Sequence, residues 1–136
     1  MSNSRFAISL HILVLLEKAQ GALVSSDYLA GSININPVLV RKELINLKKH
    51  GFVGSREGKN GGSFLSKTAT NISLGDLYIA VRQETLLGLA KNAPNPKCSV
   101  GKQINSHLNE LYDNTEQVLI ESLSGRSLAD FSEEFQ

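Results

Sequence analysis

The N-terminal part of the chain opens on a wide apolar stripe at helical spacing. Apolar residues recur every three or four positions up to Lys18, among them Phe6, Leu10, Leu13 and Val14. Further aliphatic residues widen the stripe, and an apolar surface this wide predicts a helix that is buried on several sides. Gly21 follows, and we expect it to end this helix, because glycine readily takes the backbone conformation of a helix C-terminus.

Two further helices are predicted after this one. Ser25 or Ser26 can cap a short second helix over residues 27–30, which we expect Gly31 to end. The pair Asn36–Pro37 opens a third helix, since asparagine is a strong N-cap and proline fits the first helical position. This third helix ends near residue 50, and its inward stripe is Val40, Leu44 and Leu47.

The next segment changes from helical spacing to a hairpin pattern. Residues 52–56 and 63–67 can pair as two strands around the turn 57–62, whose glycines and asparagine tolerate positive φ. A fourth helix begins at Ser73–Leu74. Residues 91–99 then form a linker with two prolines, and one long helix of roughly 24 residues runs to about Ser124 before a short terminal helix.

The order of these elements is that of a winged helix-turn-helix: helix, short helix, tight turn, third helix, then a Gly-rich hairpin. The predicted fold class is therefore mainly α with a small two-stranded β wing, extended by a long C-terminal helix. We expect a DNA-binding domain over residues 1–84, a linker over 85–98, and a long dimerisation helix with a short terminal helix over 99–136.

The charge is distributed unevenly along a chain whose formal net charge is only +1. Residues 36–60 hold six basic and two acidic side chains, a net charge of +4. Residues 103–136 hold one basic and seven acidic side chains, a net charge of −6. A polyanion would be attracted to the first segment and repelled by the second, which favours DNA binding by the third helix and the hairpin.

The candidate DNA-binding residues divide by the part of DNA that they could reach. The exposed start of the third helix could enter a major groove and read bases, with the candidates Asn36, Val38, Leu39, Arg41 and Lys42. Basic residues further along could hold phosphates, namely Lys48, Lys49, Arg56 and Lys59. Two serines at the start of the second helix and an asparagine in the hairpin turn complete the set: Ser25, Ser26 and Asn60.

Each of these features also has an ordinary structural interpretation. A basic helix end is often a solvated face that complements the helix dipole. A Gly-rich hairpin tip is often only a turn. Taken alone, neither indicates DNA, but the ordered set within about 45 residues favours it over the structural alternative.

The chain resembles the IscR–NsrR–CymR family of bacterial winged-helix regulators, the Rrf-two family, and within it the YwnA-like subgroup. Nearly the whole chain takes part, and the matching segments are SRFAISLHIL, VSSDYLA, NPVLVRKELINLKKHGFV, SREGKNGGS, ISLGDLYIAV, PNPKCSVGK and RSLADF. The wing differs from some relatives, which carry an arginine directly before the first wing glycine where this chain has Glu57. Arg56 is one residue earlier and would point to the opposite face of the strand, which argues against insertion into the minor groove.

The resemblance implies a homodimer in which the long helix pairs with its mate. The sequence agrees with this, because the long helix carries an apolar stripe that needs a partner: Ile104, Leu108, Leu111, Thr115 and Val118. The alternative is that the stripe packs only on its own domain.

Cys98 is the single cysteine, which excludes an internal disulfide and a multi-cysteine metal site. Several family members hold an iron–sulfur cluster on three cysteines near this position. Such clusters need several thiolate ligands, so we expect no metal and no cofactor in this chain. Cys98 is either a free thiol in a linker or a redox sensor whose thiolate is favoured by Lys97 and the helix N-terminus.

These features together predict a sequence-specific transcriptional regulator, a repressor that binds double-stranded DNA as a homodimer on a partly palindromic operator. A small molecule or a protein could act as its effector. No apolar run reaches the roughly 20 residues of a membrane span, so we expect no membrane partner and a cytoplasmic protein. One rival is a winged-helix module that binds and regulates a partner protein. The other is an enzyme such as a thiol peroxidase, for which the sequence supplies no convincing catalytic group beyond Cys98.

Overall fold

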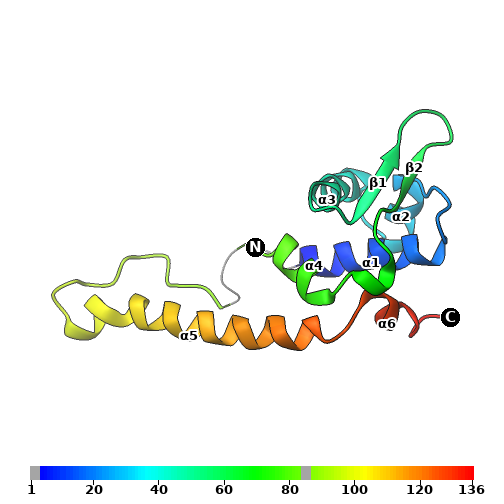
Figure 1. Ribbon diagram of the computed structural model, residues 1–136. Coiled ribbons are helices and arrows are strands. Elements are labelled where there is room, and N and C mark those ends of the chain that lie inside the picture. Colours follow the sequence, from blue (N-terminus) through cyan, green and yellow to red (C-terminus); the bar gives the residue numbers. More distant parts are fainter. Residues whose placement is uncertain (1–3, 84–86) are drawn as a thin grey trace.

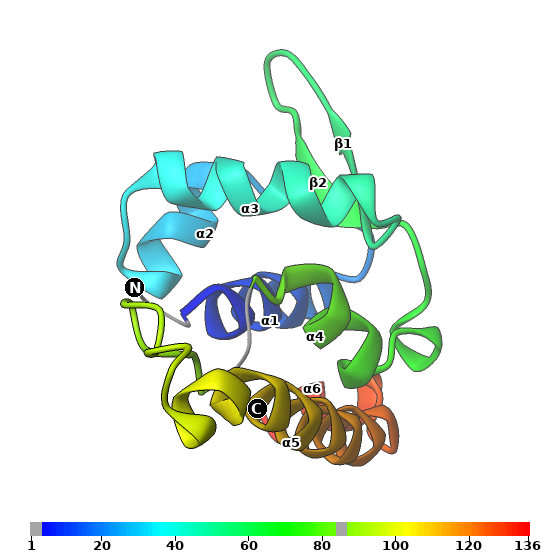
Figure 2. The same cartoon turned by 90° about the vertical axis from the view of Figure 1, so that its left-hand side faces the viewer.

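The computed structural model describes residues 4–83 and 87–136. The predicted boundary between residues 84 and 85 therefore lies outside the described residues. Three helices come first: α1 (Ser4–Lys18), α2 (Ser26–Ile33) and α3 (Pro37–Lys49). Helix α1 runs through the middle of the body, with α2 and α3 on one side of it, α5 and α6 on the other, and α4 beside it (Figures 1 and 2). This position explains the wide apolar stripe of α1, which contacts α2, α3, α4, α6 and the wing strand β2.

Helix α2 is longer than the sequence pattern indicated. It continues through Gly31 to Ile33 and ends at Asn34, which takes a left-handed conformation with φ of 64°. Glycine inside a helix costs only about 1 kcal/mol relative to alanine. The burial of Leu29 and Ala30 against the core offsets that cost, so the prediction that Gly31 ends the helix is wrong.

The wing consists of two antiparallel strands, β1 (Val53–Arg56) and β2 (Gly62–Leu65), with Arg56 opposite Gly62 next to the turn that joins them. The backbone of Val24 pairs with Ser63 through two hydrogen bonds, which ties the wing to the segment before α2. Gly62 lies at this junction, where a Cβ atom would be 2.6 Å from the carbonyl oxygen of Val24. A larger residue there would therefore push the wing away from α2.

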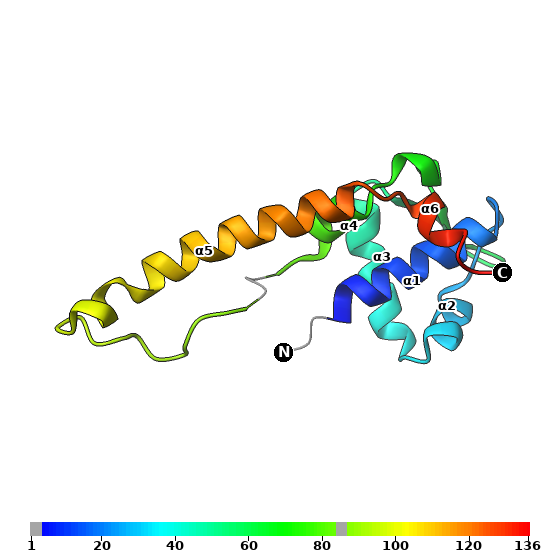
Figure 3. The same cartoon turned by 90° about the horizontal axis from the view of Figure 1, so that it is seen from below.

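The remaining elements are η1 (Ala69–Asn71), α4 (Leu74–Val81), α5 (Ser99–Ser124) and α6 (Leu128–Ser132). The core lies where α1, α2, α3, α4 and α6 meet, and its fully buried side chains include Ile12, Leu13, Leu29, Leu47, Leu77 and Leu128. Helix α5 packs on α4 at one end and extends far beyond the body at the other (Figures 1 and 3). The predicted fold class, mainly α with a two-stranded wing, is confirmed. Within the described residues, no helix is long and apolar enough to span a membrane.

Candidate nucleic-acid interface

Helix α3 begins in the way that its sequence predicts. Asn36 is the N-cap, and its Oδ1 accepts a hydrogen bond of 2.9 Å from the backbone N–H of Val38. Pro37 occupies the first helical position, where its missing N–H costs nothing. Asn36 is exposed, but this side-chain oxygen is engaged within the helix. Its amide nitrogen is the part that could approach a base.

The faces of α3 separate sharply by exposure. Val40, Glu43 and Leu47 are buried, with exposed fractions of 0%, 5% and 0%. Positions spaced by four and three residues share a helix face, so the outer stripe opposite the buried side consists of Val38, Lys42, Ile45 and Lys49. All four are exposed, and cations alternate with aliphatic residues along the stripe. Lys42 therefore lies where the sequence pattern placed it, away from the core.

Two long-range contacts fix the position of α3. The guanidinium of Arg5 on α1 contacts both carboxylate oxygens of Glu43, with Nε at 2.8 Å from Oε2 and Nη2 at 3.1 Å from Oε1. The side-chain amide of Asn46 donates to the carbonyl oxygen of Ala80 on α4 at 3.1 Å. These two polar contacts lie on one flank of the apolar seam, and together with the buried seam they hold the helix in one orientation, so that the outer stripe is presented on a fixed support.

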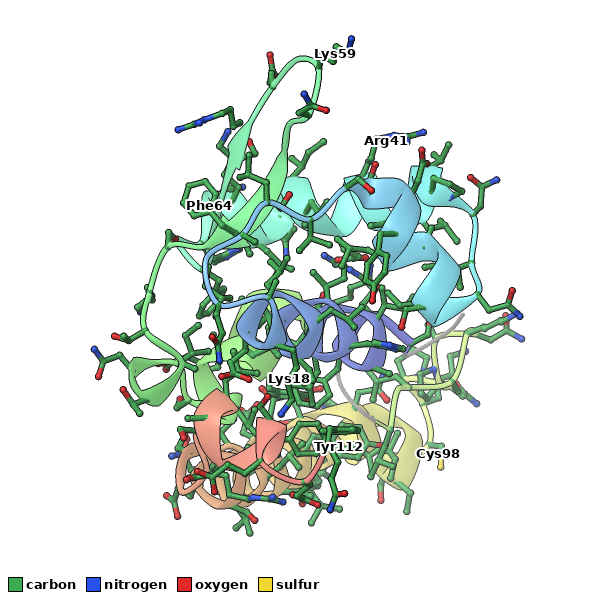
Figure 4. All side chains as sticks on the ribbon, turned by 90° about the vertical axis from the view of Figure 1, so that its right-hand side faces the viewer. Lys18, Arg41, Lys59, Phe64, Cys98 and Tyr112 are labelled. Carbon is green, nitrogen blue, oxygen red and sulfur yellow. The ribbon has the colours of Figure 1, made fainter. Side chains whose placement is uncertain are left out.

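The wing places its charged residues on the same side of the molecule as the exposed part of α3. Lys59 lies at the wing tip and Arg41 on the outer side of α3, both at the top of Figure 4. The tip turns through Gly58 and Asn60, whose φ values of 92° and 66° are left-handed. Arg56, Lys59 and Asn60 are all exposed. The molecule therefore carries basic side chains on both the helix and the wing, facing the same direction.

A hollow of about 380 Å³ separates α3 from the wing. Arg41, Lys48 and Arg56 border it with Ser26, and Glu57 is the one acidic residue in its lining. Lys48 Nζ donates to Ser55 Oγ at 3.0 Å, which links the end of α3 to β1. Three cations around one open hollow form a surface suited to a phosphate group.

The structure brings some predicted residues together and separates others. Ser26 joins the cations of the hollow, whereas Ser25 lies at the edge of a second hollow of about 450 Å³ between α1, α2 and the wing. Ser25 is the N-cap of α2, and its Oγ accepts from the backbone N–H of Tyr28 at 3.1 Å. Lys49 lies on the outer stripe of α3 and does not line either hollow.

Sequence reasoning missed Ile45, whose side chain is 71% exposed in the middle of α3. Val38 and Leu39, which were among the candidates, are 59% and 47% exposed. Helical periodicity could have revealed Ile45, because it lies three residues after Lys42 and outside the Val40–Leu44–Leu47 stripe. Leu44 itself is only half-buried, and Glu43 takes the fully buried place beside Val40 and Leu47.

Helix α5 offers a different kind of surface. None of its 26 residues is buried in the single chain. Along the predicted stripe, Leu111 and Val118 are 55% and 67% exposed, Thr115 is exposed, and Ile104 and Leu108 are half-buried. The neighbouring face carries Tyr112 and Glu116, and Glu116 accepts hydrogen bonds from Tyr78 of α4 and from Arg82, the C-cap of that helix. One face of α5 thus packs on its own chain while an apolar stripe stays open.

Cys98 is the N-cap of α5, and its Sγ accepts from the backbone N–H of Gly101 at 3.4 Å. The thiol is exposed. Among the described residues, no three His, Cys, Asp or Glu side chains gather in a way that could hold a metal ion. The structure thus gives Cys98 a structural role at the start of α5.

Comparisons with known proteins agree along nearly the whole chain. The chain is 41% identical to a protein named as an HTH-type transcriptional regulator, YwnA of Bacillus subtilis (strain 168), over 96% of each chain. It is 36% identical to a crystal structure described as a DNA-binding protein, with a TM-score of 0.75, covering 94% of this chain and 98% of that one. CymR, the global cysteine regulator of B. subtilis, shares the fold at 19% identity, with a TM-score of 0.71 and coverage of 100% and 98%.

A family model also matches residues 2–134, that of Rrf2, described as an iron-dependent transcriptional regulator. The donor set of this chain does not fit an iron–sulfur cluster, because Cys98 is its only thiol and that sulfur caps a helix. The match therefore supports the fold and the class of transcriptional regulators, but the residues of this chain do not fit the iron site. On the extent of these matches, the chain belongs to the Rrf2 family of transcriptional regulators.

Proposed function

We propose that the chain is a sequence-specific DNA-binding transcriptional repressor. The observation that carries this proposal is the shared face of α3 and the wing. Arg41, Lys48 and Arg56 surround one hollow there, and the outer stripe of α3 is free to enter a groove. The helix supplies base contacts and the flanking cations supply phosphate contacts, which is the division of labour in winged helix-turn-helix proteins. A regulator of this kind acts where its DNA lies, which in a bacterium is the cytoplasm.

The proposed working form is a homodimer on a partly palindromic operator. The open apolar stripe of α5 supports it, because Leu111 and Val118 would otherwise stay exposed on a long helix that extends beyond the body. Two-fold symmetry then presents two copies of α3, and each would read one half-site. An effector that changed the angle between α5 and the winged-helix body would change the distance between the two reading helices. The effector would be a small molecule or a protein.

Duplex binding at several salt concentrations tests the proposal. Fluorescence anisotropy with a duplex enriched from a random library should show tight binding. The logarithm of the association constant should fall linearly with the logarithm of the salt concentration. The slope should be about 0.9 for each phosphate neutralised. A duplex of the same length with a scrambled sequence should bind more weakly, and its affinity should still fall with salt concentration. Absence of binding to any enriched duplex at low salt would overturn the proposal.

A second candidate function is a module that binds a partner protein. The exposed aliphatic residues of α3 favour it, since Val38, Leu39 and Ile45 all leave apolar surface open, and exposed apolar surface can mark protein interfaces. The same titration separates the two functions, because protein–protein contacts centred on an apolar patch do not lose affinity with salt as steeply as DNA contacts do.

A further inference from the structure

The outer stripe of α3 combines exposed aliphatic side chains with cations. Val38 and Ile45 are 59% and 71% exposed, and they occupy positions i and i+7 of one face. Lys42 and Lys49 alternate with them on the same stripe, and Arg41 and Lys48 stand on the flank toward the wing. A single exposed aliphatic side chain needs no explanation, but two on one face of a fixed helix do.

The surrounding charge decides what could cover these side chains. Every ionised side chain on the exposed part of α3 is a cation, since Glu43 is turned inward and paired with Arg5. An apolar protein patch framed by four cations would need an acidic apolar partner. A DNA major groove supplies both features at once, because its walls carry phosphates and each thymine presents a C5-methyl group on the groove floor.

We propose that Val38 and Ile45 read thymine methyl groups, so that the operator half-site carries thymines at fixed positions. This inference rests on the proposed DNA-binding function and names the bases that it recognises. Seven residues of helix span about 10 Å, and neighbouring bases of one strand are about 3.4 Å apart along the duplex. A helix lying along the groove would therefore place the two thymines about three base pairs apart, with Lys42 directed at the base pairs between them.

Removing the methyl group from DNA tests this directly. Two random duplex libraries are selected against the full chain, one with thymidine and one with deoxyuridine in its place. Deoxyuridine lacks only the C5-methyl group and keeps the groove acceptor O4. The thymidine library should yield a motif with thymines about three base pairs apart in each half-site. The deoxyuridine library should lose the preference at those positions while keeping the others.

The side chains are assigned by a cycle of substitutions on the selected duplex. Replacing one read thymine by deoxyuridine should weaken binding about fourfold, the effect of one buried methyl group. Ile45→Ala should weaken the thymidine duplex by a larger factor, and on this variant the deoxyuridine change should have almost no further effect. Lys49→Ala, on the same stripe, is the control. In that variant the factor by which the substitution weakens binding and the factor for the deoxyuridine change should multiply. Ile45 is exposed and alanine favours helices, so the variant should fold as the parent does.

The outcomes distinguish this inference from the function on which it rests. The same motif from both libraries, or losses that multiply for Ile45→Ala as they do for Lys49→Ala, would overturn methyl reading and leave DNA regulation standing. No enrichment from either library would overturn both and assign the stripe to a partner protein.

Discussion

Arg5 of α1 and Glu43 of α3 form a forked ion pair beneath the reading helix. The Glu43 side chain is 6% exposed and that of Arg5 is 25% exposed, so the carboxylate depends on this partner more than the guanidinium does. Removal of Arg5 leaves a buried charge without compensation, whereas removal of Glu43 leaves an arginine that water can still reach. The two losses should therefore be unequal.

We expect Arg5→Ala to lower the free energy of unfolding by about 3 kcal/mol and Glu43→Ala to lower it by less. The double variant Arg5→Met/Glu43→Leu should recover most of the loss, because it replaces the pair with apolar packing. The exposed pair Arg126–Glu134 is the control, and Arg126→Ala should cost below about 1 kcal/mol. Urea unfolding at one fixed protein concentration measures all four, and equal costs for Arg5→Ala and Glu43→Ala would contradict this account.

A second prediction concerns alkaline pH. Burial raises the pKa of Tyr78 above its ordinary value of 10.0, and the nearby carboxylate of Glu116 adds to the effect, while Arg82 opposes it. A raised pKa means that the folded state holds the phenol proton more tightly than the unfolded state. The resulting stability is present below pH 10 and is lost as the pH rises through the pKa of the folded state. Above pH 10, unfolding temperatures of the parent should therefore fall more steeply than those of Tyr78→Phe, and parallel curves would contradict the prediction.

The local signals in the sequence predicted the fold well because they act within a few residues. The Asn36–Pro37 cap and the stripe of α1 each determine the backbone near them, and the structure confirms both. In the wing turn, Gly58 and Asn60 take the positive φ that their residue types allow. The buried Glu43 could not be predicted in this way, because its partner is 38 residues away in sequence. Glycine at position 31 was misread for the same reason, since the burial of its neighbours is a property of the tertiary fold.

The basic residues of the candidate site could be predicted from the sequence, but their arrangement could not, and sequence reasoning missed the exposed Ile45. Basic residues at the end of α3 and in the wing are visible in the sequence. Their grouping is not, since Lys48 turns toward Ser55 and the wing while Lys49 lies on the outer stripe. Exposure also distinguishes between apolar residues of the same helix. Ile45 is exposed and therefore belongs to the candidate site, whereas Leu47 is buried.

The oligomeric state can be tested on Leu111 and Val118, the exposed large apolar residues of the α5 stripe. Leu111→Glu with Val118→Glu should place four like charges in the proposed dimer seam and give monomers. Neither side chain is buried in the single chain, so the variant should stay folded. Gln117→Glu is a control that adds charge to another exposed position of α5. Light scattering and circular dichroism measure the mass and the helix content, and a parent that is monomeric at micromolar concentration would contradict the dimer.

The N-cap role of Cys98 gives a separate prediction. Serine is a much stronger N-cap than a thiol, so Cys98→Ser should keep or raise the thermal stability, by up to about 1 kcal/mol. Its affinity for the selected duplex under reducing conditions should equal that of the parent. Peroxide treatment of the two proteins then shows whether the thiol senses oxidation, because only the parent would lose affinity if Cys98 were a sensor.

Residues of α3 that recognise bases should be separable from residues that only contact phosphates. Arg41 borders the hollow beside the wing and Lys42 lies on the outer stripe one turn into the helix, where bases would be in reach. Lys49 lies two turns after Lys42 at the end of the helix, where the phosphate backbone of bound DNA would pass. A base contact discriminates between sequences by roughly 1–3 kcal/mol, whereas a phosphate contact weakens all sequences about equally.

Arg41→Ala and Lys42→Ala should therefore lower the ratio of affinities for the selected and scrambled duplexes by about tenfold or more. Lys49→Ala should leave this ratio nearly unchanged and reduce the salt slope by about one unit. Anisotropy titrations with both duplexes at several salt concentrations measure the ratio and the slope on the same samples. If all three substitutions weakened both duplexes by the same factor, α3 would hold the backbone only, and recognition would have to come from the wing or from the shape of the DNA.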